Sequence, residues 1–170
     1  MKNAMKITLK VLMSVFCGFF LPATLCPLYV YAKTDTDVPV KVAQSSEYYG
    51  GMYGIDPNLI RAICFVESSY IPTMDNGQCK GIMEVNTDVH QDVMEMKNIT
   101  DIYDIDQNIN CGAWVLYQYL EEDEDINVVL MRYNGDYTGL KNYYKTGAVS
   151  EYVNKVLDLQ SRLKTDMKTY

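Results

Sequence analysis

The residue best placed for chemistry is a carboxylate that contributes nothing to stability. Glu67 follows Ile63 by four residues and Cys64 by three, so it lies on or beside the apolar stripe of a predicted helix. Burial disfavours the charged form of a carboxylate, and so does the negative end of a helix dipole, so both should raise the pKa of Glu67. A carboxyl group that stays protonated near neutral pH can act as a general acid. On this helix alone, an ordinary surface glutamate at a helix end is the alternative.

The helix that carries Glu67 is one of six that the sequence predicts. It is expected over residues 56–68, because Asp56 followed by Pro57 is a helix-start signal. Residues 33–39 are expected to be a short flexible lead, and residues 40–165 a mostly helical single domain. Loops are expected at residues 69–80 and around Gly135 and Gly139. The other predicted helices span residues 40–53, 84–96, 106–121, 127–133 and 150–164.

Three more segments follow Glu67-Ser68 in an informative order. They are Gly81-Ile82-Met83-Glu84, which begins 14 residues after Glu67, then Arg132-Tyr133-Asn134, and finally Tyr152-Val153. Together these segments resemble the catalytic-domain signature of the soluble lytic transglycosylases, in the lysozyme-like superfamily. That signature has Glu-Ser on a helix, then Gly-Leu-Met-Gln, then Ala-Tyr-Asn, with a late Tyr-Val helix. The resemblance covers about residues 40–160.

The resemblance implies a mostly α, lysozyme-like single domain, and it allows a small β-hairpin in the loop at residues 69–80. It implies an enzyme without cofactor or metal that cleaves peptidoglycan glycan strands at the MurNAc-GlcNAc β-1,4 bond. In this family one glutamate protonates the leaving oxygen and then takes a proton from the sugar's own 6-hydroxyl group. That hydroxyl attacks internally and gives a 1,6-anhydromuramic product. Holding the nucleophile on the substrate exploits proximity, so no base is needed to activate water.

The resemblance also implies roles for individual residues. Glu67 takes the acid/base role, and Ser68 helps to hold the site. Tyr133 matches the tyrosine that orients the acid, and Asn134 matches the asparagine that contacts the substrate. The full set matched to the substrate-binding groove is Ser68, Met83, Glu84, Tyr133, Asn134 and Tyr152.

Some of these matches leave alternatives open. Plain core packing is the alternative for Met83 and Tyr152. Glu84 stands where the family usually has Gln, and Arg132 where it usually has Ala. Glu84 could position a water molecule, which would make the protein a lysozyme-type muramidase that uses both Glu67 and Glu84. The interpretation we favour for Glu84 is a salt bridge with Arg132 or Lys80.

A second function class is a protein that kept the fold and lost the activity. Such a protein would be a binding or assembly module of an envelope-spanning secretion or conjugation apparatus. The intact Glu67 and Tyr133-Asn134 favour the enzyme. The formal net charge of −7 argues against a nucleic-acid partner held by phosphate contacts.

The N-terminus has the pattern of an export signal. Lys2, Lys6 and Lys10 form a basic region, and the apolar run from Val11 to Leu21 follows. We therefore expect a signal peptide at residues 1–32, cleaved after Ala32, and an exported protein in the cell envelope or outside the cell. An uncleaved membrane anchor is the alternative, which the prolines after the apolar run disfavour. Cleavage would leave 12 basic and 22 acidic side chains, a formal net charge of −10.

Three cysteines remain after this cleavage. We expect Cys64, on the buried stripe, to be an inert core thiol, and Cys79 and Cys111 to form a disulfide, although sequence alone does not fix the pairing. His90 is the single histidine, and we expect it on a helix surface. Nothing around His90 is suited to be the partner that a Cys-His or Ser-His-Asp catalytic group needs. No residues form a zinc-binding pattern either.

Overall fold

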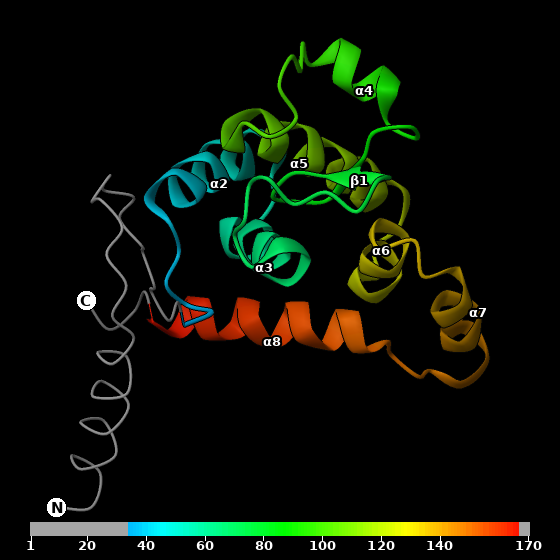
Figure 1. The fold of residues 1–170 in the computed structure, drawn as a ribbon. Coiled ribbons are helices and arrows are strands. Elements are labelled where there is room, and N and C mark those ends of the chain that lie inside the picture. The colour runs from blue at the N-terminus through cyan, green and yellow to red at the C-terminus, as the bar shows by residue number, and fades with distance from the viewer. Residues whose placement is uncertain (1–33, 167–170) are drawn as a thin grey trace, which may run out of the picture. The chain divides into compact units, whose positions relative to one another are not determined.

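The computed structural model describes residues 34–166, so the predicted signal peptide at residues 1–32 lies outside the described residues. Within residues 34–166 the fold consists of seven helices and one two-stranded antiparallel hairpin (Figure 1). No helix in this range is both long enough and apolar enough to cross a membrane. The helices are α2 (Val40–Tyr53), α3 (Pro57–Ser68), α4 (Gln91–Met96), α5 (Ile105–Glu122), α6 (Ile126–Tyr133), α7 (Tyr137–Thr146) and α8 (Glu151–Asp166). The strands are β1 (Cys79–Lys80) and β2 (Val85–Asn86).

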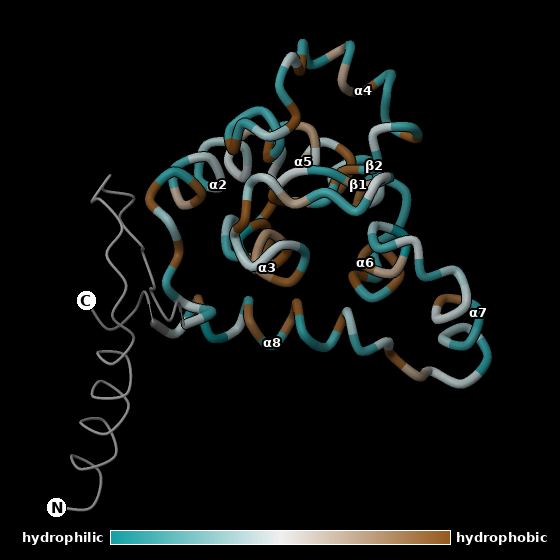
Figure 2. Tube along the Cα trace, viewed as in Figure 1, coloured by the Kyte–Doolittle hydropathy of each residue, from teal (hydrophilic) through white to brown (hydrophobic). Residues whose placement is uncertain are grey.

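Helix α3 forms the centre of the core. It packs against α2 on one side and α8 on another, while α5 packs against α2 and α6. The predicted apolar stripe is buried, and Ile60, Ile63 and Cys64 have no exposed surface. Figure 2 shows hydrophobic and hydrophilic stretches alternating along α8. The hydrophobic face of α8, including Val153 and Val156, is buried in the same core.

Local capping explains the sharp limits of α3. The Asp56 carboxylate accepts a hydrogen bond from the backbone N–H of Asn58, and Pro57 occupies the first turn, as predicted. Asp56 also accepts from Gln160 and pairs with Lys164 at 2.7 Å, so the start of α3 is tied to α8. At the other end Ser69 adopts a left-handed conformation with φ 52°. This left-handed residue caps the helix, which ends at Ser68.

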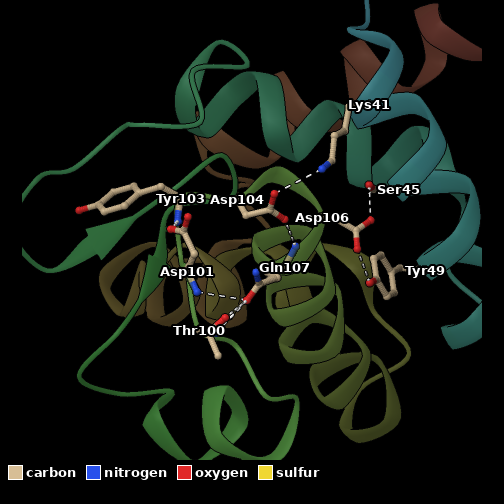
Figure 3. A network of polar contacts seen from close by, with 9 residues as sticks. All are labelled: Lys41, Ser45, Tyr49, Thr100, Asp101, Tyr103, Asp104, Asp106 and Gln107. Carbon is tan, nitrogen blue, oxygen red and sulfur yellow. Dashed lines mark hydrogen bonds and ion pairs between the residues drawn. The ribbon is translucent and has the colours of Figure 1, made fainter.

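A polar network fixes the N-terminal end of α5 against α2 (Figure 3). The Asp106 carboxylate accepts hydrogen bonds from Ser45 at 2.7 Å and from Tyr49 at 2.9 Å. Lys41 and Asp104 form an ion pair at 3.3 Å at the edge of this network. Side chains of α5 also hold the hairpin, so this network helps to position the hairpin as well as α5.

Two predictions about the elements are wrong. Residues 84–96 are not one helix, because residues 85–86 form β2 and the helix begins only at Gln91. Glu84 has a left-handed backbone with φ 48°, which a helix does not accommodate, and Val85 pairs across the hairpin with Lys80. The hairpin therefore reaches beyond the loop at residues 69–80 in which it was expected.

The loop expected around Gly135 and Gly139 contains helix α7. Asp136 caps this helix by accepting a hydrogen bond from the Gly139 N–H at 2.7 Å. Gly147 ends it in a left-handed conformation with φ 73°. These two terminal signals outweigh the helix-weakening effect of a glycine inside the first turns. The other predicted helices agree with the structure to within two residues at each end.

Candidate active site

Glu67 lies in the last turn of α3, with its side chain held by a tyrosine from α8. The Tyr152 hydroxyl donates a hydrogen bond to Glu67 Oε1 at 2.7 Å. Burial raises the pKa of Glu67 to about 7, and the charge of Glu84 adds to this effect, whereas the hydrogen bond from Tyr152 opposes it. The rise in the pKa of Glu67 agrees with the direction predicted from the sequence. A carboxyl group with a pKa near 7 is matched to proton transfer in both directions at neutral pH.

The hydroxyl that contacts the Glu67 carboxyl group in the structure is that of Tyr152, and the role of Tyr133 in orienting an acid stays a prediction. The Tyr133 hydroxyl donates instead to the backbone carbonyl of Met83, at 3.0 Å. Tyr133 comes from α6 and passes close to Gly112 of α5, where an added Cβ would lie 3.0 Å from the tyrosine hydroxyl. Tyr133 therefore supports the backbone of the turn that follows β1, while Tyr152 contacts the carboxyl group itself.

Two of the residues matched to the substrate groove are buried. The Met83 side chain has no exposed surface and packs in the core, which favours its core-packing alternative, and its contact with a substrate stays a prediction. Ser68 is 1% exposed, and its Oγ lies 2.8 Å from the carbonyl oxygens of both Cys64 and Ile82. Ser68 thus joins the end of α3 to the turn after β1. These contacts hold the turn in place, and a contact between Ser68 and a substrate stays a prediction.

A buried asparagine of α5 holds the turn between the two strands. Asn108 accepts a hydrogen bond from the Met83 N–H at 2.8 Å and donates to the carbonyl oxygens of Lys80 and Ile102, both at 2.9 Å. Gly81 is required here, because its φ is +81° and an added Cβ would lie 2.0 Å from Asn108 Nδ2.

Glu84 takes part in no ion pair with Arg132 or Lys80, so the predicted salt bridge is wrong. Arg132 pairs with Glu122 instead. Glu84 Oε2 accepts a hydrogen bond from Asn76 Nδ2 at 2.8 Å, which ties this carboxylate to the loop before β1. Burial raises the pKa of Glu84, and the hydrogen bond from Asn76 opposes that rise.

Two hollows meet at Asn134, which is exposed and lines both. The larger hollow, of about 610 Å³, contains Glu67 and Tyr152 and continues along α8. The smaller hollow, of about 200 Å³, has Glu84 in its wall. Tyr133, which was matched to the groove, also lines the smaller hollow, whereas sequence reasoning missed wall residues from segments without a recognisable motif. They include Asp35, Lys155 and Arg162 in the larger hollow and Tyr119 and Tyr137 in the smaller one.

The predicted disulfide is absent, because Cys79 and Cys111 are both free thiols in the structure. Cys111 is buried on α5 near the charged groups of Asp92 and Lys97, whereas Cys79 lies on β1 near Glu84. Within residues 34–166 no three His, Cys, Asp or Glu side chains are grouped so as to hold a metal ion.

The prediction that His90 lies on a helix surface is wrong. It precedes the first residue of α4, is half-buried, and lines the smaller hollow. Burial lowers its pKa, so the neutral imidazole is favoured there.

Comparison with known families agrees with this geometry. The model of the Transglycosylase SLT domain matches residues 44–151, more than half of the chain. The chain therefore belongs to this family, and its mostly helical fold with a small hairpin is lysozyme-like. It is a peptidoglycan lytic transglycosylase, an enzyme that cleaves a glycosidic bond. A search of curated protein sequences found no significant match.

Proposed function

We propose that Glu67 is the single acid/base of this enzyme and that the product carries a 1,6-anhydromuramic end. The observation that carries the proposal is the Glu67 carboxyl group, held by Tyr152 at 2.7 Å with a pKa of about 7, in the wall of a hollow of about 610 Å³. A hollow of this size falls in the range of small-ligand sites. It suits a short length of glycan.

The reaction needs one proton to move twice. Protonated Glu67 donates its proton to the glycosidic oxygen as the bond to the muramic acid carbon breaks. The resulting carboxylate then accepts the proton of the sugar's 6-hydroxyl group, whose oxygen forms the new bond to the same carbon. Glu67 ends protonated, and no water is consumed. Asn134, exposed beside the acid, is the residue we assign to contact the substrate.

We assign Glu84 a structural part in the groove wall. Its carboxylate is held by Asn76 and lines the smaller hollow, whereas Glu67 lies in the larger one. A lysozyme-type hydrolase is the second candidate, because Glu84 is near enough for its charge to raise the pKa of Glu67. In that case Glu84 would activate water, and an inverting geometry would require the two carboxyl groups to lie roughly 6.5–9.5 Å apart.

Mass spectrometry of digested peptidoglycan distinguishes the two reactions. Transglycosylation gives products with anhydro ends, each lighter by one water than the hydrolysis product. We expect anhydro ends from the wild type and from Glu84→Gln, and no cleavage by Glu67→Gln, whose amide cannot donate the proton. Reducing ends in the wild type that become anhydro ends in Glu84→Gln would instead establish the muramidase. Substantial turnover by Glu67→Gln would place the acid elsewhere.

We also propose that the protein is exported, with residues 1–32 removed as a signal peptide. The support is the basic and apolar pattern of the N-terminus, together with a substrate that lies in the cell envelope. Mass spectrometry of the exported protein should find an N-terminus at or near Lys33. An intact N-terminus on the exported protein would favour the membrane-anchor alternative.

An enzyme of this size would open the wall locally for an envelope-spanning apparatus, and cross-linking in intact cells tests for that partner.

A further inference from the structure

The larger hollow ends at an ion pair some distance from the acid. The residues of α8 that line the hollow recur every three or four positions, so they belong to one face of the helix. From Tyr152, beside the acid, to Arg162 this face extends about 15 Å at 1.5 Å per residue. At that point Arg162 pairs with Asp35, which belongs to the segment before α2.

This ion pair separates two hollows. Asp35 and Arg162 line the larger hollow and also line a third one of about 340 Å³, which we call the distal hollow. Arg162 Nη2 lies 2.5 Å from Asp35 Oδ2, and Arg162 Nε donates to Asp158 at 3.0 Å. The guanidinium group is therefore fixed by two carboxylates, one from α8 itself and one from across the hollow.

The segment that carries Asp35 is itself well held. In the lead, residues 34–39, the Asp37 N–H donates to the Thr34 carbonyl at 3.0 Å, which forms a turn with Asp35 inside it. Val38 packs against the core and anchors the end of this turn. Figure 1 shows the lead (blue) against the C-terminal end of α8 (red). The predicted flexibility of the lead stays a prediction. In the structure the lead contributes Asp35 to the wall of the larger hollow.

We propose that the Asp35–Arg162 pair is a stop for the glycan strand and determines how many sugar units extend past Glu67 on this side. The proposal rests on the proposed role of Glu67. A strand in the larger hollow meets the paired side chains before it can reach the distal hollow. Cleavage then takes place at a fixed distance from a strand end, and short products of one main length are released. Without the pair the two hollows join, and the strand can pass through.

The test uses uncross-linked glycan strands and the mature protein, with product lengths measured by mass spectrometry. We expect the wild type to release one main short product, and Asp35→Ala and Arg162→Ala each to increase the share of longer products several-fold. The matched control is Lys41→Ala, which breaks an ion pair of similar exposure with Asp104, away from all three hollows. This control should leave product length unchanged.

A second measurement uses salt, because the pair is partly exposed and its attraction is screened by ions. High salt should shift the wild-type products toward those of Asp35→Ala and should change the products of Asp35→Ala much less. Unchanged product length in both Asp35→Ala and Arg162→Ala, with each variant folded by circular dichroism, would overturn the proposal.

The same products separate this idea from the proposed function. If the stop is wrong but Glu67 is the acid, all variants give anhydro ends with wild-type lengths. If Glu67 is not the acid, Glu67→Gln still cleaves, whatever the lengths of the products. A length shift in Arg162→Ala alone would also contradict the proposal, because it assigns the effect to the pair.

Discussion

Replacing Glu67 by Gln should stabilise the domain at alkaline pH, because it removes an acid whose charge is unfavourable where it lies. Burial raises the pKa of Glu67 from 4.5 to about 7 in the folded protein. The folded state therefore favours the protonated form more than the unfolded state does. The contribution of this group to stability is fully present below pH 4.5 and is lost as the pH rises through about 7.

The size of the effect follows from the shift in pKa. The two values differ by about 2.5 pH units, and each unit corresponds to about 1.4 kcal/mol, so the loss amounts to about 3 kcal/mol. Gln keeps the shape of the side chain and an oxygen that can accept the Tyr152 hydrogen bond. It does not titrate, so this part of the pH dependence should disappear.

Urea unfolding of the wild type and Glu67→Gln at several values between pH 4.5 and pH 8 measures the difference. The free energy of unfolding of Glu67→Gln should gain about 3 kcal/mol relative to the wild type over this range. The control is Glu151→Gln, at an exposed position in the wall of the same hollow, where Lys155 lowers the pKa of the glutamate. Because the lowered pKa of Glu151 places its titration below this range, the gap between Glu151→Gln and the wild type should stay nearly constant from pH 4.5 to pH 8. A constant gap between the wild type and Glu67→Gln would refute the reasoning, because the carboxyl would then titrate alike in both states.

Three other predictions concern the same site. The proposed role of Glu67 requires its protonated form, so kcat/KM should fall about tenfold per pH unit above its pKa near 7, as a pH–rate profile would show. Tyr152→Phe removes a hydrogen bond that lowers the pKa of Glu67, so this limb of the profile should move to higher pH while the maximum rate falls. Gly81→Ala should lower the free energy of unfolding by more than about 2 kcal/mol, because it adds a clash with Asn108 to backbone strain. In thermal unfolding, Gly77→Ala, which has φ +97° and open space, should lose less.

The sequence predicts well what local signals control. The limits of α3 follow from Asp56, Pro57 and the end of its apolar stripe, and the structure agrees with them. The raised pKa of Glu67 was also predictable, because helical spacing alone places this carboxyl group beside the buried stripe. These inferences need only the neighbours of a residue along the chain.

Inferences that depend on the third dimension were less successful. Tyr133 and Tyr152 are the same residue type in equally plausible motifs, and only the packing of α6 and α8 decides which hydroxyl reaches Glu67. The split of residues 84–96 into a strand and a short helix depends on pairing across the hairpin with Lys80. The contact between Asp35 and Arg162 joins the two ends of the described chain, where no sequence motif gives a signal.

The position of the Glu67 carboxyl group explains why several helices contact the turn after β1. A carboxyl group at the C-terminal end of a buried helix is opposed by both burial and the helix dipole, so it weakens the segment that carries it. The end of α3 must therefore be held by other contacts. Ser68 joins it to the carbonyl of Ile82, and Asn108 holds the same turn from α5. Tyr133 supports that turn from α6. Helices α5 and α6 thus hold the turn to which the end of α3 is joined, and this support lets the fold keep an acid whose own contribution to stability is unfavourable at neutral pH.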